Sequence, residues 1–133
     1  MLKVLIVEDS ATDLASLKAK VEGFGHEVLA ATSGEEGVVL AANEQPDVIL
    51  MDIVMSVPGL NGFQATRHLK RSPDTKHIPV IIVSSKSQDI DIIWGERQGA
   101  DDYLIKPVKT SVLNAAIEQV VAERMGPQSS LLA

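Results

Sequence analysis

The chain of 133 residues contains no cysteine. Disulfide bonds, thiol catalysis and thiolate metal sites are therefore excluded together. The sequence also has no apolar run near the roughly 20 residues that a membrane-spanning helix needs, and its short N-terminal apolar run, residues 4–7, leads into two acidic residues rather than a cleavage site. These absences predict a cytoplasmic protein without membrane insertion.

An excess of basic residues is missing as well. Twelve Lys and Arg residues oppose 18 Asp and Glu residues, which gives a net charge of −6. Because phosphate backbones are bound by clustered Lys and Arg, nucleic acid is not expected as a direct partner. The three histidines are scattered without an acidic or histidine partner at ligand spacing, so surface or core positions are favoured over metal or phospho-acceptor roles.

The length and composition suit one folded domain. A content of 45% hydrophobic and 23% charged residues is ordinary for a globular protein, and single domains commonly contain roughly 100 to 150 residues. We expect a domain over residues 1–125 and a disordered tail over residues 126–133. No room is left for a second domain, so an output partner is expected to act from a separate chain.

Short apolar runs and helical patterns alternate along the chain. Strands are predicted at residues 3–7, 27–31, 47–51, 80–83 and 103–105, and helices at residues 10–24, 33–45, 63–69, 88–98 and about 113–121. Ser10 and Asp13 resemble a capping box at the start of the first helix. Five strands alternating with five helices predict an α/β fold, a doubly wound parallel sheet with strand order 2-1-3-4-5 and helices on both faces.

Polar residues follow four of these strands. Glu8 and Asp9 follow the first strand, Asp52 the third, Ser84 the fourth and Lys106 the fifth. In doubly wound sheets ligands bind at the carboxyl ends of the strands, where the strand order reverses. Each pair of like charges near 4 Å costs about 4 kcal/mol at an effective dielectric constant of about 20, so the three carboxylates predict a bound cation. Oxygen ligands of this kind favour Mg²⁺.

The same residues suit phosphoryl transfer. Asp52 is the expected nucleophile, Lys106 supplies positive charge, and Ser84 donates a hydroxyl, because this chemistry depends on positioning and electrostatic stabilisation. Taken singly, each residue has a simpler explanation as a helix cap, a turn residue, a solvated charge or a loop hydroxyl. Their joint occurrence at four strand ends favours the functional explanation.

With these residues in place, the chain resembles the CheY-like receiver family from Lys3 to about Arg124. The matching segments are Val7-Glu8-Asp9-Ser10, residues 47–51 followed by Asp52, Asn61-Gly62, residues 79–84, residues 99–103, and Lys106-Pro107. A narrower resemblance, to the twitching-motility response regulators of type IV pilus chemosensory systems, comes from residues 61–67 and 94–100.

The resemblance implies a role for each site residue. Asp52 is the implied phosphorylation site, Lys106 and Ser84 contact the phosphoryl group, and Ser84 and Tyr103 form a switch. Glu8, Asp9, Asp52 and the backbone carbonyl of Val54 are the implied Mg²⁺ ligands. The peptide bond between Lys106 and Pro107 is implied to be cis.

Two positions depart from the family pattern. Glu8 stands where many relatives have Asp, so its longer side chain is expected to reach the metal through water. Gly62 lies ten positions after Asp52, about two more than the pattern, and Ser56 and Val57 look inserted. Because these residues follow Val54, the metal-binding carbonyl is expected to remain.

The implied function is a single-domain two-component response regulator of a chemosensory or twitching-motility pathway. A sensor histidine kinase would be the phosphodonor, and an effector would bind the face formed by the last two helices and the strand between them, including Trp94 and Tyr103. The protein would not be an enzyme but a phospho-acceptor that assists its own phosphorylation and dephosphorylation. A phosphorelay carrier that serves a histidine phosphotransfer domain, or the receiver part of a larger regulator, remains an alternative. A haloacid-dehalogenase-type phosphatase is disfavoured because Val54 replaces that class's second aspartate.

Overall fold

Strands and helices alternate along the chain in the computed structural model, which describes residues 1–56 and 58–125. The strands are β1 (Lys3–Val7), β2 (Glu27–Ala31), β3 (Val48–Met51), β4 (Val80–Ser84) and β5 (Asp102–Ile105), and the helices are α1 (Ala11–Glu22), α2 (Gly34–Glu44), α3 (Gly62–Arg71), α4 (Asp89–Arg97) and α5 (Thr110–Met125). The tail predicted over residues 126–133 lies outside the described residues.

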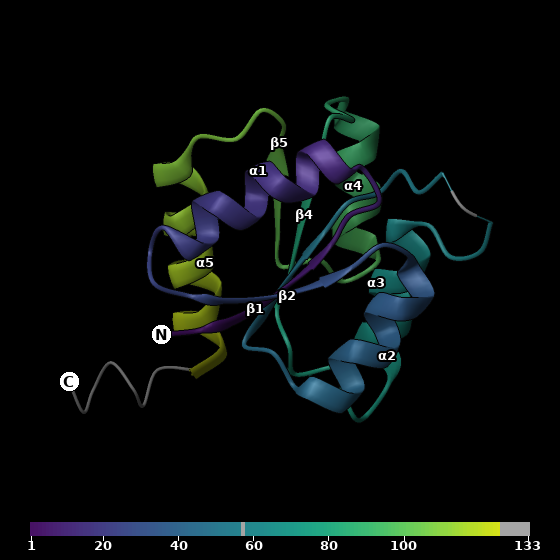
Figure 1. The fold of residues 1–133 in the computed structure, drawn as a ribbon. Helices are drawn as coiled ribbons and strands as arrows, with labels where there is room; N and C mark the ends of the chain where they lie inside the picture. Colours follow the sequence, from purple (N-terminus) through teal and green to yellow (C-terminus); the bar gives the residue numbers. More distant parts are fainter. Residues whose placement is uncertain (57, 126–133) are drawn as a thin grey trace.

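The strands form one parallel sheet in the order β2-β1-β3-β4-β5 (Figure 1). Val7, the last residue of β1, pairs with Ala31 of β2 and with Met51 of β3. Ser84 at the end of β4 pairs with Ile105 of β5. The predicted doubly wound fold and strand order are therefore confirmed, and the residues after β1, β3, β4 and β5 lie at one edge of the sheet.

Helices cover both faces of the sheet (Figure 1). On one face, Val4 and Ile6 of β1 belong to a buried cluster with residues of α1 and α5. On the other face, Leu5 and Val7 belong to a cluster with residues of α2 and α3. Such a strand has no solvent face, which is why its sequence is a continuous apolar run rather than an alternating one. Among residues 1–56 and 58–125, no helix has the length and apolar character needed to cross a membrane.

The predicted capping box at the start of α1 is only half present. The Ser10 hydroxyl accepts a hydrogen bond from the backbone N–H of Asp13 at 3.3 Å, as expected. The Asp13 carboxylate does not return to Ser10, however, because it accepts a hydrogen bond from Lys106, and the Ser10 N–H donates to Glu8 instead. The prediction was therefore correct for the Ser10 cap and wrong for the Asp13 carboxylate, which pairs with Lys106 instead.

The start of α3 lies directly against the backbone of the residue that follows β3. The Gly62 N–H donates to the carbonyl oxygen of Ile53 at 3.0 Å. A Cβ atom on Gly62 would stand 2.0 Å from the carbonyl oxygen of Asp52 and 2.6 Å from the Cα of Ile53. Only glycine permits this approach, so Gly62 fixes where the chain after Asp52 meets helix α3.

We predict that Gly62→Ala lowers the free energy of unfolding by about 3 kcal/mol or more, because the added methyl group meets backbone atoms that cannot rotate away. Gly25→Ala is the matched control: Gly25 has a φ of +85° but nothing within 4 Å of its missing Cβ, so only the backbone cost of about 1 kcal/mol applies. Urea denaturation of both variants measures the difference, and equal losses would contradict the proposed contact.

Candidate functional site

Three carboxylates meet at the edge where β1 and β3 end. Glu8, Asp9 and Asp52 each place a carboxylate oxygen within 4.8 Å of the others. The pairing of Val7 with Met51 brings them together, since Glu8 and Asp52 are the next residues of their strands. Glu8 is 1% exposed and Asp52 is 7% exposed, while Asp9 is half-buried. A cluster of carboxylate oxygens open on one side fits a hard divalent cation.

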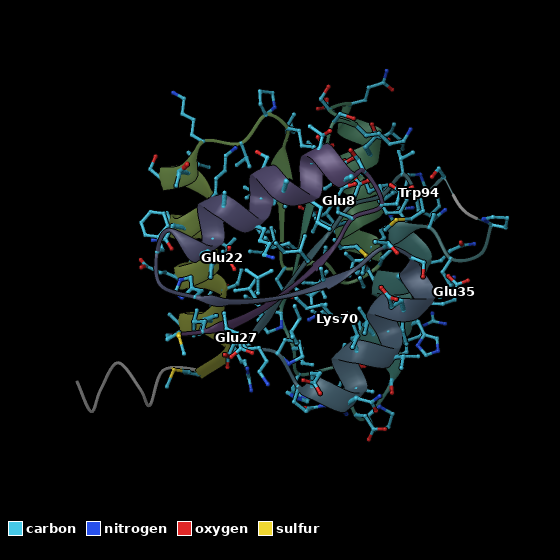
Figure 2. The ribbon with its side chains drawn as sticks, in the orientation of Figure 1. Glu8, Glu22, Glu27, Glu35, Lys70 and Trp94 are labelled. Carbon is cyan, nitrogen blue, oxygen red and sulfur yellow. The ribbon has the colours of Figure 1, made fainter. Side chains whose placement is uncertain are left out.

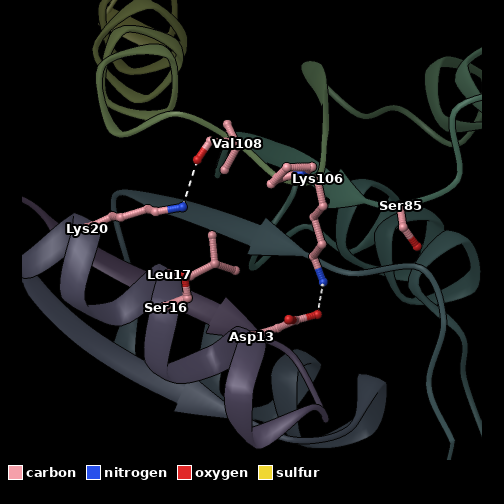
Figure 3. A pocket seen from close by; sticks show the side chains of 8 residues that line it. Asp13, Ser16, Leu17, Lys20, Ser85, Lys106 and Val108 are labelled. Atoms are coloured by element: carbon pink, nitrogen blue, oxygen red, sulfur yellow. Dashed lines mark hydrogen bonds and ion pairs between the residues drawn. The ribbon is translucent and has the colours of Figure 1, made fainter.

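Lys106 faces this cluster from the end of β5. Its Nζ lies 2.5 Å from Glu8 Oε1, 2.9 Å from Asp13 Oδ2 and 3.6 Å from Asp52 Oδ1. The Lys106, Glu8 and Asp52 side chains are at most 17% exposed, so the pairs of Lys106 with Glu8 and Asp52 are shielded from water more than surface pairs are. The Asp13 side chain is 45% exposed, so its pair with Lys106 is more accessible to water. Figure 2 marks Glu8, and Figure 3 shows the contact of Lys106 with Asp13.

Asp13 is a site residue that sequence reasoning missed, because it was assigned to the helix cap. It stands in the first turn of α1, directly after the loop that carries Glu8 and Asp9. A carboxylate in the first turn of α1 lies at the same edge of the sheet as the cluster. This position could have indicated from the sequence that Asp13 belongs to the site. Its partner Lys106 is 93 residues away in sequence, which no local pattern reveals.

The charges of the cluster shift the pKa values of its members. Burial, and next the charge of Glu8, raise the pKa of Asp52 to about 6, although Lys106 acts in the opposite direction. Burial lowers the pKa of Lys106, but its hydrogen bonds to Glu8 and Asp13 outweigh this effect and raise that pKa above the ordinary value. The negative charge of Asp52 is therefore only partly compensated by Lys106.

The loop after β3 returns to Asp9. Ser56 donates two hydrogen bonds to Asp9 Oδ2, from its backbone N–H at 2.6 Å and from its hydroxyl at 2.5 Å. These bonds lower the pKa of Asp9 below its usual value. Val54 lies between Asp52 and Ser56 on this loop and is 51% exposed. Val57, the second residue of the predicted insertion, lies outside the described residues.

Ser84 and Tyr103 are connected through one peptide segment. Ser84 is fully buried at the end of β4, and its hydroxyl accepts a hydrogen bond from the Lys86 N–H at 3.2 Å. The Tyr103 hydroxyl donates to the Lys86 carbonyl oxygen at 2.6 Å. Burial, and next the charge of Asp91, raise the pKa of Tyr103, which therefore keeps its proton as a donor. The two residues implied as a switch thus share the backbone of Lys86.

A groove extends from Lys106 along α1. It encloses about 380 Å³ and is lined by residues of α1 and of the segments that follow β4 and β5: Asp13, Ser16, Leu17, Lys20, Ser85, Lys106, Pro107 and Val108 (Figure 3). Lys20 Nζ donates to the Val108 carbonyl oxygen at 2.7 Å and links the two sides. The peptide bond between Lys106 and Pro107 is cis, as the resemblance implied.

Residues 4–118 match the model of the response regulator receiver domain. The chain belongs to this family. Receiver domains are signalling phospho-acceptors of two-component systems, which take phosphate from sensor histidine kinases and act on effectors. The CheY-like resemblance is thereby confirmed, and the chain is a response regulator.

Individual relatives agree with this assignment. The chain is 55% identical over 122 residues to the protein PilH of Pseudomonas aeruginosa. The aligned region covers 92% of this chain and 99% of PilH. This identity agrees with the narrower resemblance drawn from residues 61–67 and 94–100.

Two solved structures share the fold. A response regulator structure from Chloroflexus aurantiacus superimposes with a TM-score of 0.86 at 30% identity, over 91% of this chain and 98% of that one. The receiver domain of the sensor histidine kinase PA1611 from Pseudomonas aeruginosa has a TM-score of 0.83 at 26% identity, over 91% and 98% of the two chains. That structure holds a magnesium ion coordinated in its active site cleft.

We predict that Asp52→Asn stabilises the metal-free protein. Because the pKa of Asp52 is raised from 3.8 to about 6, ionised Asp52 destabilises the fold above pH 6, and this effect declines as the pH falls from 6 toward 3.8. The gain should be on the order of 2 kcal/mol at pH 8 and smaller at pH 5. Urea denaturation in EDTA at both pH values measures it. A substitution that destabilises the protein at pH 8 would contradict the proposed electrostatic balance.

Proposed function

We propose that Asp52 is the phospho-acceptor of this response regulator. One observation carries the proposal: the Asp52 carboxylate lies at the carboxyl end of the sheet with its charge under-compensated, beside two further carboxylates and 3.6 Å from the ammonium group of Lys106. A carboxylate oxygen of Asp52 attacks the phosphorus atom of the donor, and the bond between phosphorus and the donor's leaving group breaks. The product is an acyl phosphate on Asp52.

We further propose Mg²⁺ as the cation of the site, held by Glu8, Asp9, Asp52 and the backbone carbonyl of Val54. When bound, the ion supplies positive charge that offsets the repulsion between the carboxylates and an incoming phosphoryl group. The oxygen chemistry of the cluster supports this assignment, and so does the magnesium ion in the PA1611 receiver domain.

Lys106 and Ser84 are the proposed contacts of the phosphoryl oxygens. Lys106 is held at the site by Glu8 and Asp13, so its ammonium group is already oriented toward Asp52 before a phosphoryl group arrives. Ser84 offers a hydroxyl from the end of β4, which is separated from β1 by β3 alone. Preorganised donors of this kind stabilise charge that develops in the transition state. The same groups would assist dephosphorylation, so the protein acts on its own phosphoryl group rather than on other substrates.

The proposed effector surface is the face of α4, β5 and α5. Its apolar side chains are exposed: Ile90, Ile93, Trp94 and Ile105 are each 43–52% exposed. Arg97 lies over the Trp94 ring at 5.8 Å from its centroid. Gly95 of α4 packs against the Tyr103 ring. Tyr103 in turn is hydrogen-bonded to the backbone of Lys86, which is also hydrogen-bonded to Ser84. We propose a sensor histidine kinase as donor and, from the identity to PilH, a pathway of the type IV pilus.

We predict that the wild-type chain gains one phosphoryl group from a small-molecule phosphodonor such as acetyl phosphate, only with Mg²⁺ present, and that Asp52→Asn gains none. Intact-mass spectrometry measures the product directly. Asp89→Asn, which changes an exposed aspartate of α4, is the matched control and should be modified like the wild type. A wild-type chain that is never modified, or an equally modified Asp52→Asn variant, would refute the assignment of Asp52.

We also predict that phosphorylation changes the fluorescence of Trp94, which is the only tryptophan of the chain. The expected cause is a movement of Ser84 toward the phosphoryl group, which alters its bond to Lys86 and, through Lys86, the position of Tyr103 against α4. Emission spectra recorded during phosphorylation test this, with Asp52→Asn as the unresponsive control. An unchanged spectrum in a chain that is fully phosphorylated by mass would contradict the proposed connection.

A further inference from the structure

Ser56 holds one oxygen of one candidate metal ligand. Its N–H and its hydroxyl both donate to Asp9 Oδ2, at 2.6 and 2.5 Å. Among the described residues, no hydrogen bond ends on Asp9 Oδ1. A carboxylate oxygen has two lone-pair directions, so two short hydrogen bonds occupy Oδ2 and leave Oδ1 as the oxygen of Asp9 that is available to a cation.

Asp9 differs from the other two carboxylates in what restrains it. Glu8 and Asp52 are almost fully buried at the ends of their strands, and Lys106 binds Glu8 directly. Asp9 is half-buried one residue further along the loop, and among the described residues the ion pairs of Lys106 are with Glu8, Asp13 and Asp52 rather than with Asp9. An aspartate in this position has rotational freedom that metal binding must remove. The two hydrogen bonds from Ser56 remove it beforehand.

The loop that carries Ser56 is anchored to α2 at Leu60. The Leu60 N–H donates to Glu35 Oε1 at 2.9 Å, and Glu35 belongs to the first turn of α2. Gly59 lies so close to the same carboxylate that a Cβ atom there would stand 1.9 Å from Glu35 Oε2. Figure 2 shows Glu35 on α2 beside this loop. The loop after β3 therefore contacts Glu35 through Leu60 and contacts Asp9 through Ser56.

We propose that Ser56 is a positioning residue of the metal site, which orients Asp9 so that Oδ1 is available to Mg²⁺ and thereby raises the affinity for the ion. The inference rests on the proposed function, because it assumes that the carboxylate cluster binds Mg²⁺. Hydrogen-bond partners of ligating carboxylates typically change metal affinity by about 10-fold to 100-fold when they are removed. Ser56 is one of the two residues predicted to be inserted in this loop, so the proposal gives the predicted insertion a role in the metal site.

Isothermal titration calorimetry of the metal-free 133-residue chain with MgCl₂ tests the proposal without any phosphodonor. We expect Ser56→Ala, which removes the hydroxyl and keeps the N–H, to weaken Mg²⁺ binding by about 10-fold. Ser56→Thr keeps a hydroxyl and should bind within about 2-fold of the wild type, a recovery expected only if the hydroxyl is responsible. Ser87→Ala changes an exposed serine of another loop and should leave the affinity unchanged. Far-UV circular dichroism checks that each variant is folded.

The outcomes separate this inference from the proposed function. If the wild type binds no Mg²⁺, the proposed metal site itself fails. If the wild type binds and Ser56→Ala binds equally well, the proposed function stands and the role of Ser56 is refuted. Tighter binding by Ser56→Ala also refutes it, because Ser56 would then compete with the ion for Asp9 rather than position the ligand.

Discussion

The repulsion between carboxylates at the ends of β1 and β3 is the constraint around which the site is built. The three acidic residues receive different compensation. Glu8 accepts hydrogen bonds from Lys106 and from the Ser10 N–H, and Asp9 accepts two from Ser56. Asp52 has Lys106 at 3.6 Å, and its pKa is raised to about 6 by burial and by Glu8. Lys106 thus lies farther from the residue proposed to react, Asp52, than from Glu8, which leaves binding energy available for a cation and a phosphoryl group.

The sheet keeps these charged side chains close together because its central strands, β1 and β3, cannot move apart. The residues of β1 from Val4 to Val7 are fully buried between two layers of helices, so a shift of register would move apolar side chains and charged neighbours at once. Because Gly62 has no side chain, the start of α3 can also pack closely against the backbone of Asp52. The favourable packing of the apolar layers thus offsets the repulsion between the carboxylates at the edge of the sheet.

The sequence alone predicted the parts of the molecule that depend on local order along the chain. The strands, their order, and the positions of Glu8, Asp9, Asp52 and Lys106 followed from apolar runs that end in polar residues. The role of Asp13 did not, because the same residue fits a helix cap locally and an ion pair with Lys106 across the fold. Ser56 was predicted to belong to an insertion, but its contact with Asp9, 47 residues away in sequence, depends on the path of the loop in three dimensions. Side-chain direction in loops is set by such distant anchors rather than by periodicity.

Two loops reach the site from different sides and connect it to different parts of the surface. The loop after β3 joins Asp9 to Glu35 of α2 through Ser56 and Leu60. The segment after β4 joins Ser84 to Tyr103 through the backbone of Lys86, and Tyr103 contacts α4. The two paths share no described residue. The proposed metal ligand Asp9 and the proposed switch residues Ser84 and Tyr103 are therefore connected to different parts of the surface.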